Sequence, residues 1–218
     1  MKTTAVLLVI AGLLIAGYPL AERAYTWYWQ QRLLSEWEAT ELVAHYRPEA
    51  AGTEAVDTEP AETVTEPQSS PAPAPIGILT IEKIGLKIPI LPGTGNAALR
   101  IGAGLSDEGA AIGEEGNVIL TAHRAHTYGR LFNRLDELEP GDGIIITTRD
   151  GSYRYTVYHQ AIVKPEDVAV PRPVEGRSLL TLITCHPLYH PNPPYRLVVQ
   201  ACAAAPSTGK APGVRTFD

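Results

Sequence analysis

Three side chains that could take part in acyl transfer lie at the ends of predicted strands. Cys185 closes the run SLLTLITC, His123 closes NVILTAH, and Arg196 stands near the start of YRLVVQA. A thiol can act as a nucleophile, an imidazole can protonate a leaving amine, and a guanidinium can stabilise a developing oxyanion. If the fold brings these strand ends together, the three groups form a site for breaking and re-forming acyl bonds.

Each of these residues also has an ordinary structural explanation when taken alone. A single cysteine is more often a small buried hydrophobe than a nucleophile. His123 taken alone fits a hydrogen-bonded core histidine, and Arg196 fits a surface ion-pair residue. The chemistry is therefore indicated by the combination of the three and not by any one of them.

A metal site is a competing interpretation, because a set of His and Cys residues could converge. The set is His123, His126, Cys185, His186 and His190. Adjacent ligands at 185 and 186 are awkward for a closed tetrahedral zinc site, so we expect no metal and no cofactor. His126, His186 and His190 are instead expected in loops or at the rim of the site.

The elements that must position these residues are mostly short strands separated by turn signals. Apolar runs predict strands at 78–84, 86–91, 117–123, 143–148, 153–163, 178–184 and 195–201, and short helices at 96–101 and 130–135. The Asp150-Gly151 pair is typical of a hairpin turn. Many closely spaced strands without long alternating helices favour a mostly antiparallel barrel or sandwich.

Several of these segments together resemble the sortase family. TLITC (181–185) is similar to the sortase cysteine strand, TAHR (121–124) to the histidine motif, and Arg196 stands 11 residues after the cysteine. ILTIEKIGL (78–86) and LFNRLDELEPGDGI (131–144) extend the resemblance over residues 76–204. The anchored amino terminus and the residues after the cysteine look most like class D sortases.

The resemblance implies a mainly β fold, a closed eight-stranded barrel with short helices, preceded by an N-terminal membrane anchor helix. It implies a cysteine transpeptidase in which Cys185 cleaves an LPxTG-like sorting signal after Thr and forms a thioacyl-enzyme. His123 would be the general acid, and Arg196 would stabilise the oxyanion or position the substrate. Thr184 and Ala122 are expected to contribute to substrate binding. A peptidoglycan precursor amine, at the surface of a Gram-positive cell, would accept the protein.

Two departures from the family pattern bear on the substrate pocket. The residue before the histidine is commonly Gly and here is Ala122. His186-Pro187-Leu188 follows the cysteine where related members often have Tyr-Pro-Phe. The exact sorting motif is therefore not transferred from the family.

Two other classes of thiol enzyme and a non-catalytic domain are the alternatives to this function. An L,D-transpeptidase would carry its cysteine in an S-H-G-C-like loop, and a papain-like wall hydrolase would carry it at the start of a helix. A non-catalytic anchored surface domain with an inert thiol is the non-enzymatic alternative. The position of Cys185 at the end of a predicted strand favours the sortase interpretation.

The amino terminus predicts attachment to a membrane. Residues 1–22 contain a run of 17 residues without charge, Ala5 to Ala21, at the short end of what spans a bilayer. An uncleaved signal anchor with an external domain is favoured over a cleaved signal peptide, since Pro19 stands where cleavage needs a small residue. Residues 23–47, which hold all three Trp, predict a juxtamembrane helix.

The acidic character of the chain is concentrated in one segment. Residues 48–75 hold six acidic residues, six prolines and no basic residue, which is typical of a solvated linker. The net charge of −6 over 218 residues is thus carried by this segment, and the remainder balances at 18 acidic to 18 basic. No nucleic-acid partner is expected. Residues 205–218 predict a disordered tail.

Overall fold

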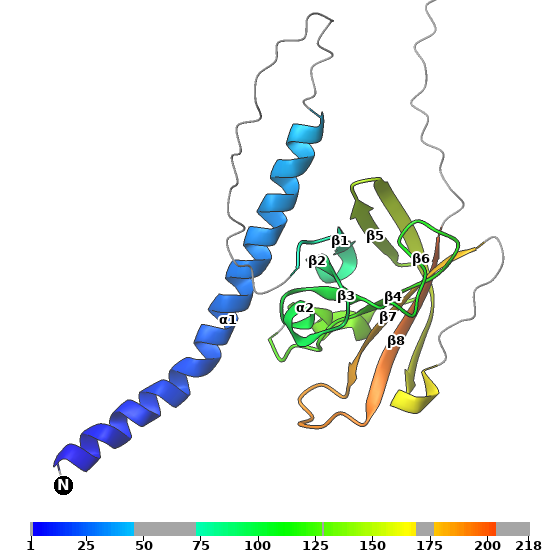
Figure 1. Cartoon of the computed structure of the whole chain (residues 1–218). Coiled ribbons are helices and arrows are strands. Elements are labelled where there is room, and N and C mark those ends of the chain that lie inside the picture. The colour runs from blue at the N-terminus through cyan, green and yellow to red at the C-terminus, as the bar shows by residue number, and fades with distance from the viewer. Residues whose placement is uncertain (1, 46–72, 128, 169–176, 204–218) are drawn as a thin grey trace, which may run out of the picture.

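The protein is built around a closed β-barrel, seen in a computed structural model that describes residues 2–45, 73–127, 129–168 and 177–203 (Figure 1). The strands are β1 (Gly77–Ile81), β2 (Leu86–Pro92), β3 (Ala103–Leu105), β4 (Gly116–Thr121), β5 (Gly143–Thr148), β6 (Gly151–Val163), β7 (Ser178–His186) and β8 (Tyr195–Ala203). They are paired in the order β1-β2-β3-β4-β7-β8-β6-β5, and β5 closes on β1. The predicted mainly β, eight-stranded closed barrel is confirmed.

The helices are few and, apart from the first, short. They are α1 (Lys2–His45), η1 (Glu82–Ile84), α2 (Asn96–Ile101), η2 (Phe132–Glu137) and η3 (Pro165–Asp167), the three η elements being 3₁₀. The helix predicted at 96–101 is confirmed, whereas that predicted at 130–135 is a 3₁₀ helix two residues further on.

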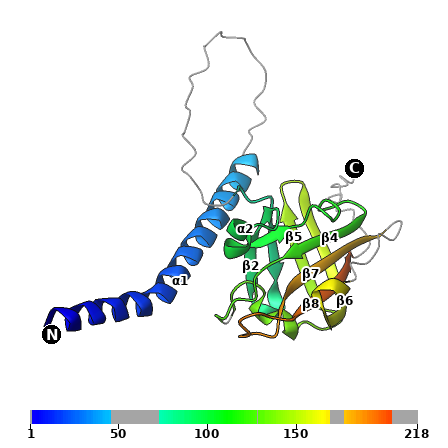
Figure 2. The same ribbon diagram turned by 60° about the horizontal axis from the view of Figure 1, so that its bottom comes forward.

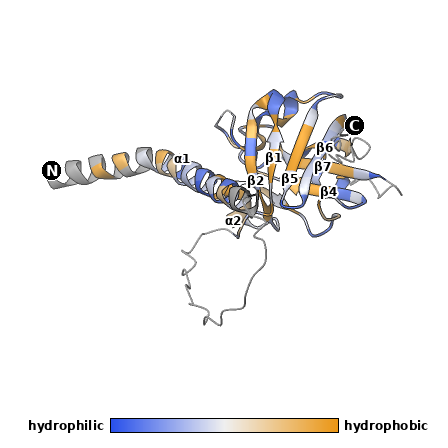
Figure 3. Ribbon diagram, turned by 90° about the horizontal axis from the view of Figure 1, so that it is seen from above, coloured by the Kyte–Doolittle hydropathy of each residue, from blue (hydrophilic) through white to orange (hydrophobic). Residues whose placement is uncertain are grey.

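Apolar side chains at alternate strand positions point inward and fill the barrel. Leu120 of β4, Leu182 of β7 and Val199 of β8 are fully buried in one continuous core, and their neighbours in sequence point to the other face. Figure 3 shows the resulting alternation of hydrophobic and hydrophilic residues along the strands. Each fully buried Leu or Ile contributes about 1.5–3 kcal/mol of transfer free energy, so the barrel is a rigid support for groups at its rim.

Several predicted strand boundaries differ from those of the structure, and the strand expected to reach His123 ends at Thr121. The strand expected to run to Ile84 ends at Ile81, because Glu82–Ile84 form a 3₁₀ turn that Gly85 closes with φ 61°. The three-residue strand β3 was not predicted, since Gly104 in its centre weakens any strand pattern. A side chain at Gly104 would collide with the carbonyl of Gly93, which explains the glycine.

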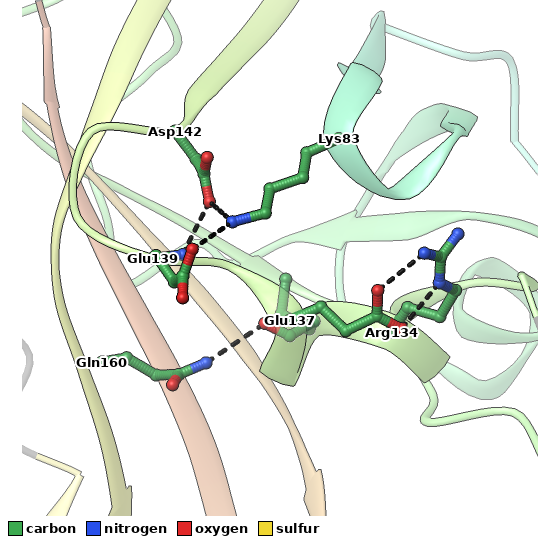
Figure 4. A network of polar contacts seen from close by, with 7 residues as sticks. Lys83, Arg134, Glu137, Glu139, Asp142 and Gln160 are labelled. Carbon is green, nitrogen blue, oxygen red and sulfur yellow. Dashed lines mark hydrogen bonds and ion pairs between the residues drawn. The ribbon is translucent and has the colours of Figure 1, made fainter.

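A salt-bridge cluster ties the segment after η2 to the turn that follows β1 (Figure 4). Lys83 Nζ lies 2.7 Å from Glu139 Oε2 and 2.8 Å from Asp142 Oδ2. The same Asp142 oxygen accepts the Glu139 backbone N–H at 2.6 Å. The hydrogen bonds to Asp142 and Glu139 raise the pKa of Lys83 above its ordinary value, so the cluster stays charged at neutral pH.

Further hydrogen bonds hold η2 itself in place. Arg134 Nη1 donates to the carbonyl of Ile84 at 3.0 Å, and its guanidinium makes a two-pronged contact with Glu137 at 2.8 and 2.6 Å. Gln160 Nε2 of β6 donates to the carbonyl of Leu135 at 3.2 Å. The segment after the histidine is thereby fixed against β6 and the end of η1.

Helix α1 packs against the barrel through its C-terminal half (Figure 2). Leu33, 2 % exposed, forms a small apolar cluster with Leu91, Ala98 and Ile101. Gln30 Nε2 donates to the carbonyl of Ile101 at 2.6 Å. The helix face therefore serves as a contact surface, which its weak apolar stripe in the sequence did not reveal.

Charged groups at both ends of this contact strengthen it. Arg100 Nη2 lies 2.7 Å from Glu22 Oε1, and Lys87 Nζ lies 2.7 Å from Glu38 Oε1. The guanidinium of Arg149 lies over the ring of Trp37, 5.6 Å from the ring centroid. The contact thus extends along α1 from residue 22 to residue 38.

The predicted membrane span is not confirmed. Within the residues that the structure describes, no helix is both long enough and apolar enough to cross a membrane. Helix α1 runs without interruption through the boundary expected between residues 22 and 23. The predicted linker, except residues 73–75, and the predicted disordered tail at 205–218 lie outside the described residues.

The contact between α1 and the barrel predicts an asymmetric response to mutation of the helix. Leu33→Ala removes a buried side chain and should lower the free energy of unfolding of the full chain by about 2–3 kcal/mol. Gln31→Ala, on the exposed side of the same turn, should lower it by less than about 0.5 kcal/mol. Denaturant titration of both variants measures the difference, and equal stabilities would show that α1 does not dock.

Candidate active site

The pairing of three neighbouring strands brings the three candidate residues together. β7 and β8 are antiparallel, with Cys185 directly opposite Arg196. β4 and β7 are parallel, with Thr121 opposite Ile183. His123 lies two residues beyond Thr121 and Cys185 two residues beyond Ile183, so this register leads the histidine to the same end of the sheet as the cysteine.

The alternation of side chains places all three on the same face. The even-numbered residues of β4 and β7, such as Leu120 and Leu182, point into the barrel core, and on β8 the odd-numbered ones, such as Leu197, do so. Cys185 and Arg196 therefore point to the outer face, and His123 continues the outward positions of β4. The predicted grouping of thiol, imidazole and guanidinium at strand ends is consistent with this arrangement.

Hydrogen bonds on the inner side of the same strand ends join the end of β4 to the end of β7. Thr184 Oγ1 donates to the carbonyl of Ala122 at 2.8 Å, and the Ala122 N–H donates to the carbonyl of Ile183 at 3.3 Å. Thr184 is 1 % exposed and Ala122 2 % exposed, so both side chains face protein. Their hydrogen bond ties the residue before Cys185 to the residue before His123. The expected contribution of both to substrate binding stays a prediction.

The surroundings of His123 favour its neutral form. His123 is exposed, yet the groups near it lower its pKa below the ordinary 6.5, mainly by desolvation and further through the positive charge of Arg100. Arg100 is itself paired with Glu22 of α1. Helix α1 thus contributes to the electrostatic environment of the histidine.

Arg196 is held near the thiol by its own strand and loop. Its Nη1 donates to the carbonyl of Tyr195 at 2.9 Å and to that of Pro193 at 3.2 Å. Among the described residues no carboxylate lies within salt-bridge distance of this guanidinium. Its charge is therefore available to a group that develops negative charge beside Cys185.

Both cysteines are half-buried free thiols. Cys202 lies opposite Leu179, six residues along β8 from the Arg196 that faces Cys185, so the register keeps the two thiols apart. Cys185 in β7 is neither in a loop nor at a helix start, which agrees with the sortase interpretation over the two other thiol-enzyme classes.

The loop that joins β7 and β8 borders the site. The ring centroids of Tyr189 and His126 lie 5.2 Å apart, and Tyr189 Oη donates to the carbonyl of His126 at 3.3 Å. His190 is exposed, and its Nδ1 accepts the Asn192 N–H at 3.1 Å. His126 and His190 are thus loop residues as predicted.

Two observations concern the edges of the site. Residues 164–177 follow β6 and contain η3, and residues 169–176 lie outside the described residues. Within the described part of the chain, no three His, Cys, Asp or Glu side chains are grouped so as to hold a metal ion.

Arg124 is a buried neighbour of the site that the sequence pattern did not indicate. Arg124 is 8 % exposed, and its Nη1 lies 2.8 Å from Nδ1 of His186. His186 was expected as a rim residue, but it is half-buried and hydrogen-bonded. The signal in the sequence was the adjacency of Arg124 to His123 and of His186 to Cys185, which strand pairing converts into contact.

Comparisons with known proteins agree with the fold. The sortase domain profile matches residues 79–204. Sortase D of Bacillus subtilis (strain 168) is 30 % identical over 200 residues, which are 91 % of this chain and 96 % of that protein.

Solved structures show the same barrel. Sortase C2 of pilus island 1 from group B Streptococcus superposes with a TM-score of 0.55 and 31 % identity, covering 60 % of this chain and 74 % of that one. Sortase A from Corynebacterium diphtheriae superposes with a TM-score of 0.57 and 30 % identity, covering 63 % and 64 %. With its closed barrel, its strand-end thiol and these relatives, the chain belongs to the sortase family of cysteine transpeptidases.

Proposed function

We propose that this sortase cleaves an LPxTG-like sorting signal after Thr, holds the released protein as a thioacyl-enzyme on Cys185, and transfers it to an amine of a cell-wall precursor. The observation that supports this most directly is the pairing of Cys185 with Arg196 on the outer face of the barrel, at the strand end that His123 also reaches. Its partners are secreted proteins that carry such a signal near the C-terminus.

The reaction consists of two acyl transfers. The neutral His123 imidazole first takes the proton of the Cys185 thiol. The resulting thiolate attacks the carbonyl carbon of the Thr residue, and the C–N bond to the next residue breaks. The departing nitrogen takes a proton from the His123 imidazolium and leaves as an amine. The acceptor amine then attacks the thioester, gives up a proton to His123, and forms the new amide as the C–S bond breaks. Division into two steps is what a covalent nucleophile provides.

Arg196 would stabilise the negative charge that develops on the carbonyl oxygen in both steps. A charge-assisted hydrogen bond from a prepositioned guanidinium is stronger than one from a neutral donor, and it needs no reorganisation during the reaction. Thr184 and Ala122, both buried, would act as positioning residues that fix the distance between imidazole and thiol.

We also propose that the chain is held in the cell membrane through its N-terminal segment, with the barrel outside. The support is the run of 17 uncharged residues from Ala5 to Ala21. Because residues 22–38 of α1 contact the barrel, such an anchor would hold the site close to the membrane surface and in a fixed orientation.

The two cysteines allow a matched test of the nucleophile. Cys185→Ala should lower the rate of cleavage of an LPxTG-type peptide by about four orders of magnitude or more, because the covalent step is lost. Cys202→Ala changes the other half-buried free thiol, on the neighbouring strand, and should leave the rate within about twofold. Mass spectrometry of the cleavage products measures both; retained activity in Cys185→Ala would refute the mechanism.

The assisting roles of His123 and Arg196 predict losses in kcat. Arg196→Lys keeps a positive charge but loses the paired N–H donors of the planar guanidinium, and should lower kcat about 100-fold. His123→Gln should lower kcat by about 100-fold or more, because the leaving amine loses its proton donor. Arg154→Lys and His159→Gln, exposed residues of β6, are the matched controls. The assignment fails if the site variants and the controls have the same steady-state constants.

The anchoring proposal predicts the distribution of the full chain between membrane and soluble fractions. The complete protein should remain with the membrane pellet after alkaline carbonate extraction, whereas a variant without residues 1–22 should be released. Leu13→Lys, which places a charge in the middle of the apolar run, should be retained less well. Release of the complete protein by carbonate would contradict a spanning anchor.

A further inference from the structure

A buried arginine connects the two strand ends of the active site from beneath. Arg124 directly follows His123, and its side chain is only 4 % exposed. Its Nη1 lies 2.8 Å from Nδ1 of His186, the residue that directly follows Cys185. Its Nη2 lies 2.8 Å from Oδ2 of Asp136 in η2. A single guanidinium therefore joins the histidine strand end, the cysteine strand end and η2.

The remaining contacts of Arg124 close the loop that carries it. Its Nε donates to the carbonyl of Asn133 at 3.4 Å, and its backbone forms a bridge with Leu131. The Phe132 N–H donates to the carbonyl of His123 at 3.2 Å. Leu131 adopts φ 47°, a conformation unfavourable for a branched side chain, which the surrounding contacts must hold in place. The loop after His123 is thus fixed by the same residues that contact Arg124.

The side-chain alternation separates this contact from the reacting groups. His186 follows Cys185 on β7 and so points to the opposite side of the strand. Arg124 and His186 meet on the inner side, while the imidazole of His123 and the thiol of Cys185 belong to the outer side. Arg124 and His186 therefore act on the reacting groups through the backbone, without touching substrate.

The chemistry of the contact fixes the state of His186. A guanidinium has only donors, so Nδ1 of His186 must accept the hydrogen bond and the proton of the neutral ring lies on Nε2. Protonation of Nδ1 would place an N–H against Nη1 of Arg124 and set two positive charges against each other. The contact therefore exists only while His186 is neutral.

The charged groups around His186 have opposite effects on its pKa. Arg124 opposes a positive charge on His186, and Asp136 of η2 favours one. Tyr195 is its partner across β8, and Arg196 lies one residue further along that strand. Desolvation is the largest influence and, together with Arg124, lowers the pKa of His186 below its ordinary 6.5. His186 is accordingly neutral at pH 7.

We propose that Arg124, His186 and Asp136 form a positioning unit that keeps the His123 and Cys185 strand ends in register, and that protonation of His186 releases it. This inference rests on the proposed roles of Cys185 and His123. It identifies three positioning residues outside the reacting group and gives the site an acid-sensitive element that is separate from the titration of His123.

The sign of the pH effect follows from proton linkage. Because the pKa of His186 is lower in the folded than in the unfolded chain, the unfolded state binds more protons as the pH falls below 6.5. The stabilisation that depends on neutral His186 is therefore complete above 6.5 and is lost as the pH falls through the lowered value. As this stabilisation is lost, the His123 and Cys185 strand ends also lose their register.

Kinetics of the full chain test the positioning role. Arg124→Lys should lower kcat about 10- to 100-fold while KM changes less than about threefold, because the reacting groups shift but the peptide surface does not. His186→Leu, which removes the acceptor, should do the same. His186→Asn keeps an acceptor near the Nδ1 position and should restore most of kcat, with a loss of activity below pH 6.5 that is smaller than in the wild type. His159→Asn is the control and should match the wild type.

A substrate-free measurement separates this inference from the proposed function. The rate of alkylation of Cys185 by iodoacetamide from pH 5 to 8 in the Cys202→Ala background should depend on Arg124 and His186, and an NMR titration should show His186 charging below 6.5. Failure of the wild type to cleave any peptide would remove the transpeptidase proposal while leaving these readouts intact. If Arg124→Lys and His186→Leu kept the wild-type kcat, KM and alkylation profile, the positioning unit would be refuted. Asp136→Asn, on a half-exposed carboxylate, supplies the test if an arginine variant does not fold.

Discussion

The parallel pairing of β4 with β7 is the constraint on which the site depends. It sets Thr121 beside Ile183 and directs the chain after each strand to the same end of the barrel. The hydrogen bond from Thr184 to the carbonyl of Ala122 maintains that pairing at its last step. Since β8 pairs with the other edge of β7, the guanidinium of Arg196 lies at the same end of the barrel as Cys185. A one-residue slip in any of these pairs would turn a reacting side chain into the core.

Two layers of residues result from this register. The outer layer holds the thiol, imidazole and guanidinium, and the inner layer holds Thr184, His186 and Arg124. The inner layer is tied to η2 through Asp136, and η2 in turn is tied to the turn after β1 and to β6. Contacts far from the reacting atoms in sequence thus determine their geometry.

Much of this arrangement could be predicted from the sequence because the signals were local. Apolar runs with turn residues gave most strands, and the polar ring or thiol at the end of each run gave His123 and Cys185. The turn at Glu82–Ile84 and the strand β3 were missed, because a 3₁₀ turn continues an apolar pattern and a glycine-centred strand has none. The helix predicted at 130–135 lies at Phe132–Glu137 and is a 3₁₀ helix, because these residues have the sequence pattern of a short α-helix.

The contacts between distant segments could not be predicted. The sequence does not indicate that Leu33 of α1 packs against the barrel, or that Arg100 pairs with a residue of α1. The surface that α1 contacts forms only when α2 and β2 are folded. His186 was expected as a rim residue for the same reason: its partner Arg124 is 62 positions away and reaches it only through the β4–β7 pairing.

The central claim is that the Cys185 sulfur carries the acyl group of the substrate. The most direct measurement is tandem mass spectrometry of the full chain quenched with acid during turnover of an LPxTG-type peptide. The account predicts a mass increase equal to the peptide up to its Thr, located on the tryptic fragment that contains Cys185. Turnover without an adduct on that fragment, or an adduct on Cys202 instead, would contradict it.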